Sequence, residues 1–300
     1  MVEKNQSHKV SIIMHTYNRA GLIMETIESI CKQTYHNWEL LIVDDGSEDN
    51  TDELVAQLND ERVHFHKAGR TGIGGKNKNI GLKLVKGELI AFIDSDDLWS
   101  ETKLDKQVEA MNQYSEAGFC LTNGYNFREP GKPAEYFYPE REGAKYDNIF
   151  VELFQSKVAA FTQALLFRKE CLDHTGPFKE EKSFSDIEFI VNLAAHFKAV
   201  ILFEPLVFRR LHDSNYITPN WEKSYFEGIE IIKSYKGKLP SDVAKNALFR
   251  TYMNFGENYL THHRQKKATS WFLKAWRYKP LSIVPFKKTV KAILYYLRDK

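Results

Sequence analysis

Three carboxylates follow a run of apolar residues in the first third of the chain. Residues 90–93 are all apolar and predict a buried strand, and Asp94, Asp96 and Asp97 come directly after it. Carboxylates at the carboxyl end of a core strand lie where open α/β sheets bind ligands. Because crowded carboxylates repel one another, they favour a bound cation, and Mg²⁺ or Mn²⁺ would share its coordination with substrate phosphates. The segment predicts a metal-assisted site for a phosphorylated ligand, although a solvated turn that caps the next helix fits about equally well.

Polar residues also follow the first predicted strand, at residues 10–14. Thr16, Tyr17 and Asn18 offer side chains and backbone that could contact a base or a ribose. The segment has neither the glycine pattern of a dinucleotide-binding turn nor that of a phosphate-binding P-loop. These absences argue against a classical NAD enzyme and against a P-loop ATPase.

Two further segments carry chemistry. Asp45 follows the strand predicted at 38–43 and could accept the N–H of a pyrimidine base, although the same residues could form a turn that caps a helix. Residues 69–81 are rich in glycine and in basic side chains, Lys78 among them, and run into a predicted helix. Backbone N–H groups at a helix start attract anions, so this segment is a candidate phosphate site; the alternative is a flexible surface loop.

The elements that position these residues alternate in type. Strands are predicted at 10–14, 38–43, 62–66 and 89–93, and helices at 22–33, 51–58, 76–85 and 101–114. This alternation predicts an α/β fold with a mainly parallel sheet flanked by helices. Residues 128–143 carry three prolines and two glycines and predict a loop; a strand is expected within 158–168, a helix at 185–197, and a strand at 200–208 that Pro205 interrupts.

Beyond Asn220 the pattern becomes almost wholly helical and strongly basic. Residues 220–300 hold 17 Lys and Arg against 6 Asp and Glu, about +11, which leaves about −9 for the rest of a chain whose total is +2. The acidic part suits a metal site, and the basic part suits either an anionic surface or a solvated helical face. The three cysteines are far apart and predict reduced thiols, and neither a membrane-spanning run nor a secretory leader is expected.

The ordered set of motifs resembles the family 2 glycosyltransferases, which are inverting enzymes with the GT-A nucleotide-sugar fold. The resemblance covers residues 9–212 and rests on four segments, with His15 and Lys78 where the family usually has Pro and Arg. It implies a GT-A catalytic domain at 1–219, with a nucleotide-sugar half at about 9–100 and an acceptor half at about 101–219, followed by a helical region at 220–300. The segments are residues 11–19 (SIIMHTYNR), 43–47 (VDDGS), 78–81 (KNIG) and 87–97 (GELIAFIDSDD).

The resemblance also assigns roles. Asp45 would contact uracil, Asp94 would hold the ribose, Asp96 would hold a divalent metal, and Asp186 would be the catalytic base, with Glu188 as the fallback. His212 would bind the metal or the diphosphate. The expected donor-binding residues are Thr16, Tyr17, Asn18, Asp45, Lys78, Asp94 and Ser95, and the expected metal ligands are Asp96 and His212.

The expected function is inverting transfer of a hexose from a nucleotide diphosphate, UDP above all, to an acceptor hydroxyl. Asp186 would take the proton of that hydroxyl and the metal would neutralise the leaving diphosphate. A glycan or lipid-linked glycan of bacterial surface polysaccharide is the expected acceptor, in the cytoplasm. The alternatives are a sugar-phosphate nucleotidyltransferase, a non-catalytic nucleotide-sugar binder, and nucleic-acid binding through the basic C-terminus, where the aromatic residues recur at the spacing of a helical core.

The last predicted helix follows Pro285 and is amphipathic and basic. Five apolar residues form one stripe, and Lys287, Lys288, Lys291 and Arg298 fall beside or opposite it. Such a helix either docks its stripe on the catalytic domain or lies in a membrane interface, which would place the protein peripherally at the inner face of the cytoplasmic membrane. The stripe consists of Phe286, Val290, Ile293, Leu294 and Leu297.

Overall fold

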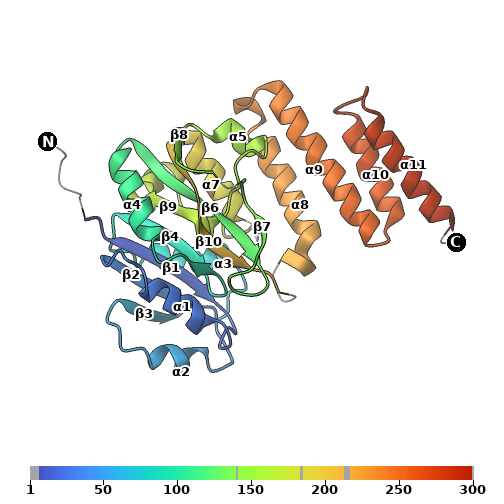
Figure 1. The fold of residues 1–300 in the computed structure, drawn as a ribbon. Coiled ribbons are helices and arrows are strands. Elements are labelled where there is room, and N and C mark those ends of the chain that lie inside the picture. The colour runs from blue at the N-terminus through green and yellow to red at the C-terminus, as the bar shows by residue number, and fades with distance from the viewer. Residues whose placement is uncertain (1–6, 140, 183–184, 213–216, 299–300) are drawn as a thin grey trace. The chain divides into compact units, whose positions relative to one another are not determined.

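The structure is a computed structural model that describes residues 7–139, 141–182, 185–212 and 217–298. It divides into two compact units (Figure 1). The first comprises residues 1–150 and 158–215, and the second comprises residues 151–157 and 216–300.

The first unit begins with the predicted alternation of strands and helices. Every strand and helix expected up to residue 114 is present, with ends that differ by a few residues. They are β1 (Val10–Thr16), α1 (Ile23–Cys31), β2 (Trp38–Asp44), α2 (Thr51–Ala56), β3 (Val63–Lys67), α3 (Gly74–Leu82), β4 (Leu89–Asp94) and α4 (Lys103–Gln113). A short strand that the sequence did not predict, β5 (Leu98–Trp99), lies between β4 and α4.

The second half of the unit completes a mixed sheet. Its elements are β6 (Ala117–Phe127), β7 (Pro133–Tyr136), β8 (Ala144–Asp147), η1 (Thr162–Ala164), β9 (Leu165–Arg168), η2 (Lys169–Cys171), α6 (Leu172–Thr175), α7 (Ser185–His196) and β10 (Lys198–Arg210). The strand order is β3-β2-β1-β4-β9-β6-β10-β5, with β7 paired to β6 and β8 paired to β10. The strands β3, β2, β1 and β4 are parallel, whereas β9 runs antiparallel to both of its neighbours.

The two faces of the sheet are buried against different helices. Ile12 and Met14 of β1 lie in one core cluster with apolar residues of α1, α2 and α4. On the other face, Phe92 of β4 contacts Phe178 and Phe189, whose rings stack on each other with centroids 4.2 Å apart. A sheet covered on both faces is what the near-continuous apolar runs of the central strands require.

One expectation for the middle of the chain needs correction, and another is confirmed. Residues 128–143 are not only a loop, because β7 lies within them and pairs with β6. The interruption expected at Pro205 is present: β10 continues past it, but the register of the ladder shifts on both sides of Pro205. A proline cannot donate to the ladder, so the strand accommodates it with an irregularity.

The second unit consists of helices in the residues that the structure describes after 216. They are α8 (Ile217–Ser234), η3 (Lys236–Lys238), α9 (Ser241–Thr261), α10 (Gln265–Trp276) and α11 (Ile283–Arg298). Most of α5 (Phe150–Phe154) also belongs to this unit. Phe255 of α9 is fully buried and lies at the centre of an aromatic core with Trp221, Tyr225 and Trp271. None of the described helices is both long and apolar enough to cross a membrane.

Candidate functional site at the carboxyl edge of the sheet

The parallel strands bring the predicted residues to one edge of the sheet. In the ladder His15 of β1 lies opposite Asp94 of β4, and Thr16 lies opposite Asp44 of β2. The segments that follow these strands therefore start side by side. This is the edge at which open α/β sheets bind ligands.

Asp96 and His212 are neighbours, although 116 positions separate them in the chain. His212 follows the end of β10, and its Nε2 lies 3.0 Å from Oδ2 of Asp96. The Nε of Arg19, just after β1, lies 3.3 Å from the same oxygen. Asp96 is thus shared by an imidazole and a guanidinium, and its side chain keeps some contact with solvent.

Asp94 contacts a different pair of side chains from Asp96. Gln163 of η1 donates a hydrogen bond to Oδ2 of Asp94, and Nδ1 of His15 lies 3.8 Å from Oδ1. Burial raises the pKa of Asp94, although Lys78 and His15 oppose that shift. Burial likewise lowers the pKa of His15. The charges of Asp94, Asp96, Lys78 and Asp186 all act on His15, so this ring lies among them.

Asp97 is oriented into the protein. Its side chain is buried and accepts the backbone N–H of Arg210 at 2.9 Å, while the Arg210 side chain donates to the carbonyl oxygen of Asp96. Burial, followed by repulsion from Asp94 and Asp96, raises the pKa of Asp97 well above its ordinary value. These contacts tie the turn after β4 to the end of β10, which also positions His212.

Asp186 forms an ion pair with Lys78, whose side chain is buried. The Lys78 ammonium of α3 donates to both carboxylate oxygens, at 2.7 and 2.6 Å, and the Thr162 hydroxyl donates to one of them at 3.0 Å. The Lys78 side chain is 4% exposed, whereas 38% of the Asp186 side chain is exposed. Burial would raise the pKa of Asp186, but the Lys78 charge and hydrogen bond hold it below its ordinary value.

Asp45 faces the glycine-rich segment. It accepts hydrogen bonds from the backbone N–H groups of Thr71 and Gly72 and from the Arg70 guanidinium. The Arg70 guanidinium also stacks on the ring of Tyr17, 3.6 Å from its centroid. Burial raises the pKa of Asp45, but the hydrogen bonds from Thr71 and Gly72 help to lower it overall, so the carboxylate is ionised at neutral pH.

The other predicted residues have different surroundings. Thr16 and Ser95 are buried, Tyr17 is half-buried and Asn18 is exposed. Asn18 has a φ of +50° and its side chain accepts the backbone N–H of Glu48, so it also shapes its own loop. Glu188, the fallback base, is buried and paired with two lysines; Lys182 lies 2.9 Å away and Lys179 is in closer contact.

Four residues that contact the predicted site residues were not predicted from the sequence. The sequence pattern could have pointed to Arg19, which directly follows the polar run after β1, and to Arg210, which lies within the segment that leads to His212. No pattern points to Thr162 and Gln163, because they belong to one turn of 3₁₀ helix before β9, a strand that pairs with β4.

A family model described as glycosyl transferase family 2 matches residues 11–175, which is more than half of the chain. The chain belongs to glycosyl transferase family 2. The matched stretch contains Asp45, Lys78, Asp94 and Asp96, whereas Asp186 and His212 lie beyond it. Membership of the family confirms the resemblance that the ordered motifs indicate.

Relatives and solved structures agree with the family assignment. The UDP-Glc:alpha-D-GlcNAc-diphosphoundecaprenol beta-1,3-glucosyltransferase WfgD of Escherichia coli is 43% identical over 106 residues, covering 34% of this chain and 40% of that protein. S. aureus TarS 1–349 in complex with UDP-GlcNAc has a TM-score of 0.67 at 18% identity, over 95% of this chain and 89% of that one. The mannosyltransferase PcManGT of Pyrobaculum calidifontis, in complex with GDP-Man and Mn²⁺, has a TM-score of 0.60 at 18% identity, over 98% and 88%.

These comparisons differ in what they establish. The two structural likenesses have low identity and establish the fold, a GT-A-like α/β domain followed by helices. The chain spans about half the length of the curated relatives it matches.

The residues at the sheet edge could hold a divalent cation whose remaining ligands a substrate would supply. Asp96 supplies a carboxylate and His212 an imidazole on the same side of the turn. The described residues hold no group of three or more His, Cys, Asp or Glu side chains that could bind a metal ion alone. Mg²⁺ and Mn²⁺ commonly take one or two protein ligands together with substrate phosphates, and two ligands match that pattern.

Proposed function

We propose that this protein transfers a hexose from a UDP-sugar to an acceptor hydroxyl, with inversion at the anomeric carbon. The observation that carries the proposal is the arrangement at the carboxyl edge of the sheet in a family 2 chain. There, Nε2 of His212 lies 3.0 Å from Oδ2 of Asp96, and the Lys78 ammonium donates a hydrogen bond to the Asp186 carboxylate. Both groups come from segments distant in sequence, so their convergence is a property of the fold.

The donor would bind along the ends of β1, β2 and β4. Asp45 is an ionised acceptor for the imide N–H of uracil, and Tyr17 offers a ring for the base. Arg70 now covers both, so binding of the base requires Arg70 to move or to stack with it. Asp94, next to Ser95, would accept from the ribose hydroxyls.

The diphosphate would lie near Asp96, His212 and Arg19. A divalent cation held by Asp96 and His212 would act as a Lewis acid on the leaving diphosphate. Arg19 can follow the developing negative charge, because its guanidinium already lies 3.3 Å from Asp96. TarS structures with UDP and UDP-GlcNAc, and the Mn²⁺ complex of PcManGT, support this choice of ligands for the fold.

Asp186 would deprotonate the acceptor hydroxyl as it attacks the anomeric carbon. One carboxylate base suffices for a single displacement, whereas double displacement would need a nucleophile as well. The ion pair with Lys78 keeps Asp186 ionised and fixes its direction. As a proton transfers to Asp186, Lys78 would shift its hydrogen bond to Thr162, which its ammonium already contacts at 3.3 Å.

The family assignment favours a transferase over a nucleotidyltransferase and over a non-catalytic nucleotide-sugar binder. A sugar-phosphate nucleotidyltransferase would need a glycine-rich phosphate loop after β1, but Gly21 is the one glycine among residues 17–22. A non-catalytic binder would not need the Lys78–Asp186 pair.

A donor panel tests the proposal. Release of UDP or GDP from a set of nucleotide sugars is measured with Mn²⁺ and an acceptor panel that includes glycan diphospholipids. We expect one UDP-hexose to be consumed in step with a new glycosidic product. Release of pyrophosphate from UTP and a sugar phosphate would instead identify a nucleotidyltransferase.

We further propose that the acceptor is a lipid-linked glycan and that α11 contacts the membrane holding it. The stripe expected on α11 is exposed within the second unit, from 38% at Val290 to 61% at Leu297, while Pro285, Thr289 and Ala292 form its buried face. Ile283 continues the stripe, and Lys287, Lys291 and Arg298 adjoin it on the helical wheel.

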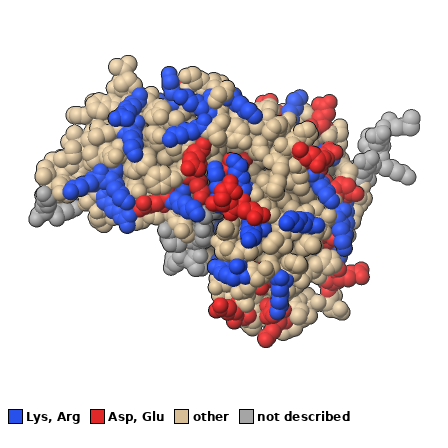
Figure 2. All heavy atoms as spheres, turned by 180° about the vertical axis from the view of Figure 1, so that it is seen from behind, with Lys and Arg blue, Asp and Glu red and all other residues tan. Residues whose placement is uncertain are grey.

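The charge of the helical unit supports an anionic partner. On the face shown in Figure 2, basic side chains gather around the C-terminal helices. An apolar stripe flanked by basic residues suits the headgroup region of anionic lipids. The acceptor of WfgD is a diphosphoundecaprenol-linked sugar, which agrees with a site of action at a lipid surface.

A further inference from the structure

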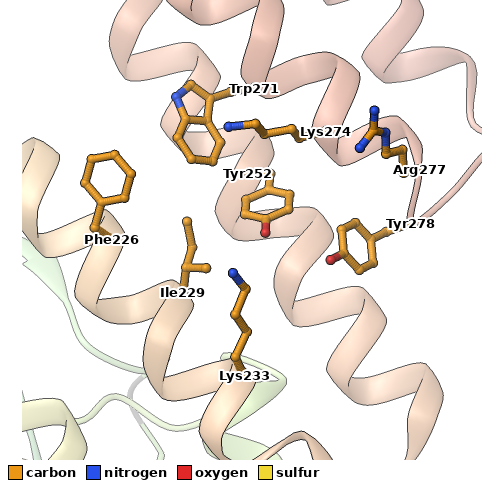
Figure 3. Close-up of a pocket in the computed structure, with 8 residues that line it drawn as sticks. All are labelled: Phe226, Ile229, Lys233, Tyr252, Trp271, Lys274, Arg277 and Tyr278. Atoms are coloured by element: carbon orange, nitrogen blue, oxygen red, sulfur yellow. The ribbon is translucent and has the colours of Figure 1, made fainter.

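A cavity in the helical unit has the chemistry of an anion site. It has a volume of about 330 Å³ and is lined by residues of α8, α9 and α10 and by the two residues that follow α10. This volume is at the lower end of the range for small-molecule pockets. Its lining residues are Phe226, Ile229, Lys233, Tyr252, Trp271, Lys274, Arg277 and Tyr278 (Figure 3).

The polar groups of this cavity are all donors or cations. Lys233, Lys274 and Arg277 contribute three positive charges, and Tyr252 and Tyr278 contribute hydroxyls. Among the described residues no carboxylate lies within 4.0 Å of any of the three cations, whereas Glu222 and Glu257 pair with lysines elsewhere in the unit. Figure 3 shows the Lys233 ammonium and the two hydroxyls directed into the same space.

The wall of the cavity is aromatic and fixed. Trp271 and Tyr252 are 8% and 7% exposed, and their ring centroids lie 5.4 Å apart. Phe226 extends this wall on one side and Tyr278 on the other, at 5.7 and 5.5 Å. Aromatic faces beside cations suit a ligand with a ring or another weakly polar body attached to an anionic group.

Helix dipoles explain part of this arrangement but not all of it. Lys233 lies in the last turn of α8 and Lys274 in the last turn of α10, where cations are favoured. That preference places each cation near its own helix end. It does not account for the convergence of two helices on one cavity, or for the tyrosine hydroxyls between them.

We propose that this cavity binds the phosphate group of a sugar phosphate or of a glycan that carries one. Lys233, Lys274 and Arg277 would pair with the phosphate oxygens, and the hydroxyls of Tyr252 and Tyr278 would donate to them. The Lys274 ammonium now lies 3.8 Å from the Trp271 ring centroid, so its turn toward the phosphate would free that ring to cover the sugar. The site lies wholly in the helical unit and is distinct from the donor site at the sheet edge. Burial, and then Tyr278, raise the pKa of Tyr252 to about 12, so its hydroxyl keeps its proton at neutral pH.

Calorimetry on the full chain tests this site, with the donor site saturated by UDP and Mn²⁺ so that phosphate cannot enter there. Inorganic phosphate and N-acetylglucosamine 1-phosphate are titrated separately, and vesicles with and without phosphatidic acid form a third arm. We expect the sugar phosphate to bind at least about fivefold more tightly than inorganic phosphate, because only it reaches the aromatic wall. Both affinities should fall with added salt.

A pair of charge-matched variants locates the binding. Lys233→Gln with Lys274→Gln removes two cations of the cavity, and Lys245→Gln with Lys266→Gln removes two exposed cations outside it. We expect the first pair to weaken sugar phosphate binding by tenfold or more and the second to change it by less than twofold, with equal UDP affinity in both. Arg277→Gln provides an independent variant if the first pair melts early.

Three results would overturn the proposal: no binding by the native chain, native-like binding by both cavity variants, or equal losses in the two charge-matched pairs. Vesicle binding without sugar phosphate binding would identify a phosphatidic acid headgroup as the phosphate source, provided that it survives Leu294→Gln with Leu297→Gln on α11 and is lost in Lys233→Gln with Lys274→Gln. None of these readings depends on glycosyl transfer, so failure here leaves the proposed function untouched.

Discussion

At the scale of single residues, Asp186 and Glu188 are two acids on one helix with opposite surroundings. Asp186 reaches solvent and pairs with one lysine, whereas Glu188 is buried and paired with Lys179 and Lys182. We expect Asp186→Asn to lower transfer by about 10²- to 10⁴-fold, the usual contribution of a general base, with UDP affinity near normal. Glu188→Gln is the matched control. Full activity in Asp186→Asn together with inactivity in Glu188→Gln would show that the base is misassigned.

Lys78 sets the pH dependence of Asp186. The charge and hydrogen bond of Lys78 lower the pKa of Asp186, so the carboxylate ionises at a lower pH than an ordinary aspartate. Activity should therefore persist at acidic pH. We expect Lys78→Met to move the acid limb of the kcat/KM profile to higher pH. Lys78→Arg should leave that limb near its native position, because it keeps the cation. An unmoved limb in Lys78→Met would separate Lys78 from the base.

Lys103 predicts an unusual dependence of stability on pH. It is fully buried over the ring of Trp99, and burial lowers its pKa to about 7. Between about pH 7 and the ordinary lysine value of 10.5, the unfolded chain binds a proton that the folded chain does not. Stability should therefore rise with pH across this window.

Lys103→Met tests that dependence. We expect the variant to be more stable than the native chain by on the order of 2 kcal/mol at pH 6, since a cation no longer has to be buried. The difference should shrink by pH 10, where the unfolded chain also begins to lose the proton. Urea midpoints at pH 6, 8 and 10 measure it, and a gain that does not change with pH would attribute the effect to packing.

At the scale of elements, the turn before β4 depends on a close approach of two backbones. A Cβ on Gly87 would lie 2.3 Å from the carbonyl oxygen of Lys9 and 2.8 Å from the nitrogen of Ser11. We expect Gly87→Ala to destabilise the protein by roughly 1–3 kcal/mol, because β1 and β4 would have to separate. Gly21→Ala is the control, since nothing lies within 4 Å of a Cβ there. Equal urea midpoints for the two variants would contradict this reading.

The sequence predicts the first four strands and their helices because each has a clear period and a turn after it. It does not predict β6, a central strand of 11 residues, because Asn123, Gly124 and Asn126 break the apolar run. Those residues are tolerated because the sheet supplies partners: the Asn123 side chain bonds the backbone of Phe203 and Tyr138.

The candidate site, like the fold, could be predicted from the sequence only in part. The polar residues after β1, β2 and β4 can be placed at one edge from the parallel order of the strands alone. The pairing of Asp96 with His212, and of Lys78 with Asp186, spans more than 100 positions and depends on how β10 and α7 return to that edge. The motifs could suggest these pairs only through the family resemblance.

At the scale of the whole molecule, the exposed stripe of α11 predicts reversible membrane binding. Leu294→Gln with Leu297→Gln removes two of its most exposed apolar side chains. Leu84→Gln with Leu273→Gln removes two exposed leucines elsewhere and serves as the control. In sedimentation with anionic vesicles at low salt, we expect the native chain and the control to pellet and the α11 variant to stay in solution. A native chain that remains in the supernatant would contradict the proposed contact.

The proposed transfer requires the donor diphosphate and a divalent cation to meet at Asp96 and His212. The most direct test is calorimetric titration of UDP into the native chain and into Asp96→Ala, each with Mn²⁺ and with a chelator, using exposed Asp105→Ala as the control. The native chain and the control should bind UDP about tenfold or more tightly with Mn²⁺, and Asp96→Ala should bind it equally weakly in both conditions. Equal affinity of the native chain with and without Mn²⁺ would contradict the account.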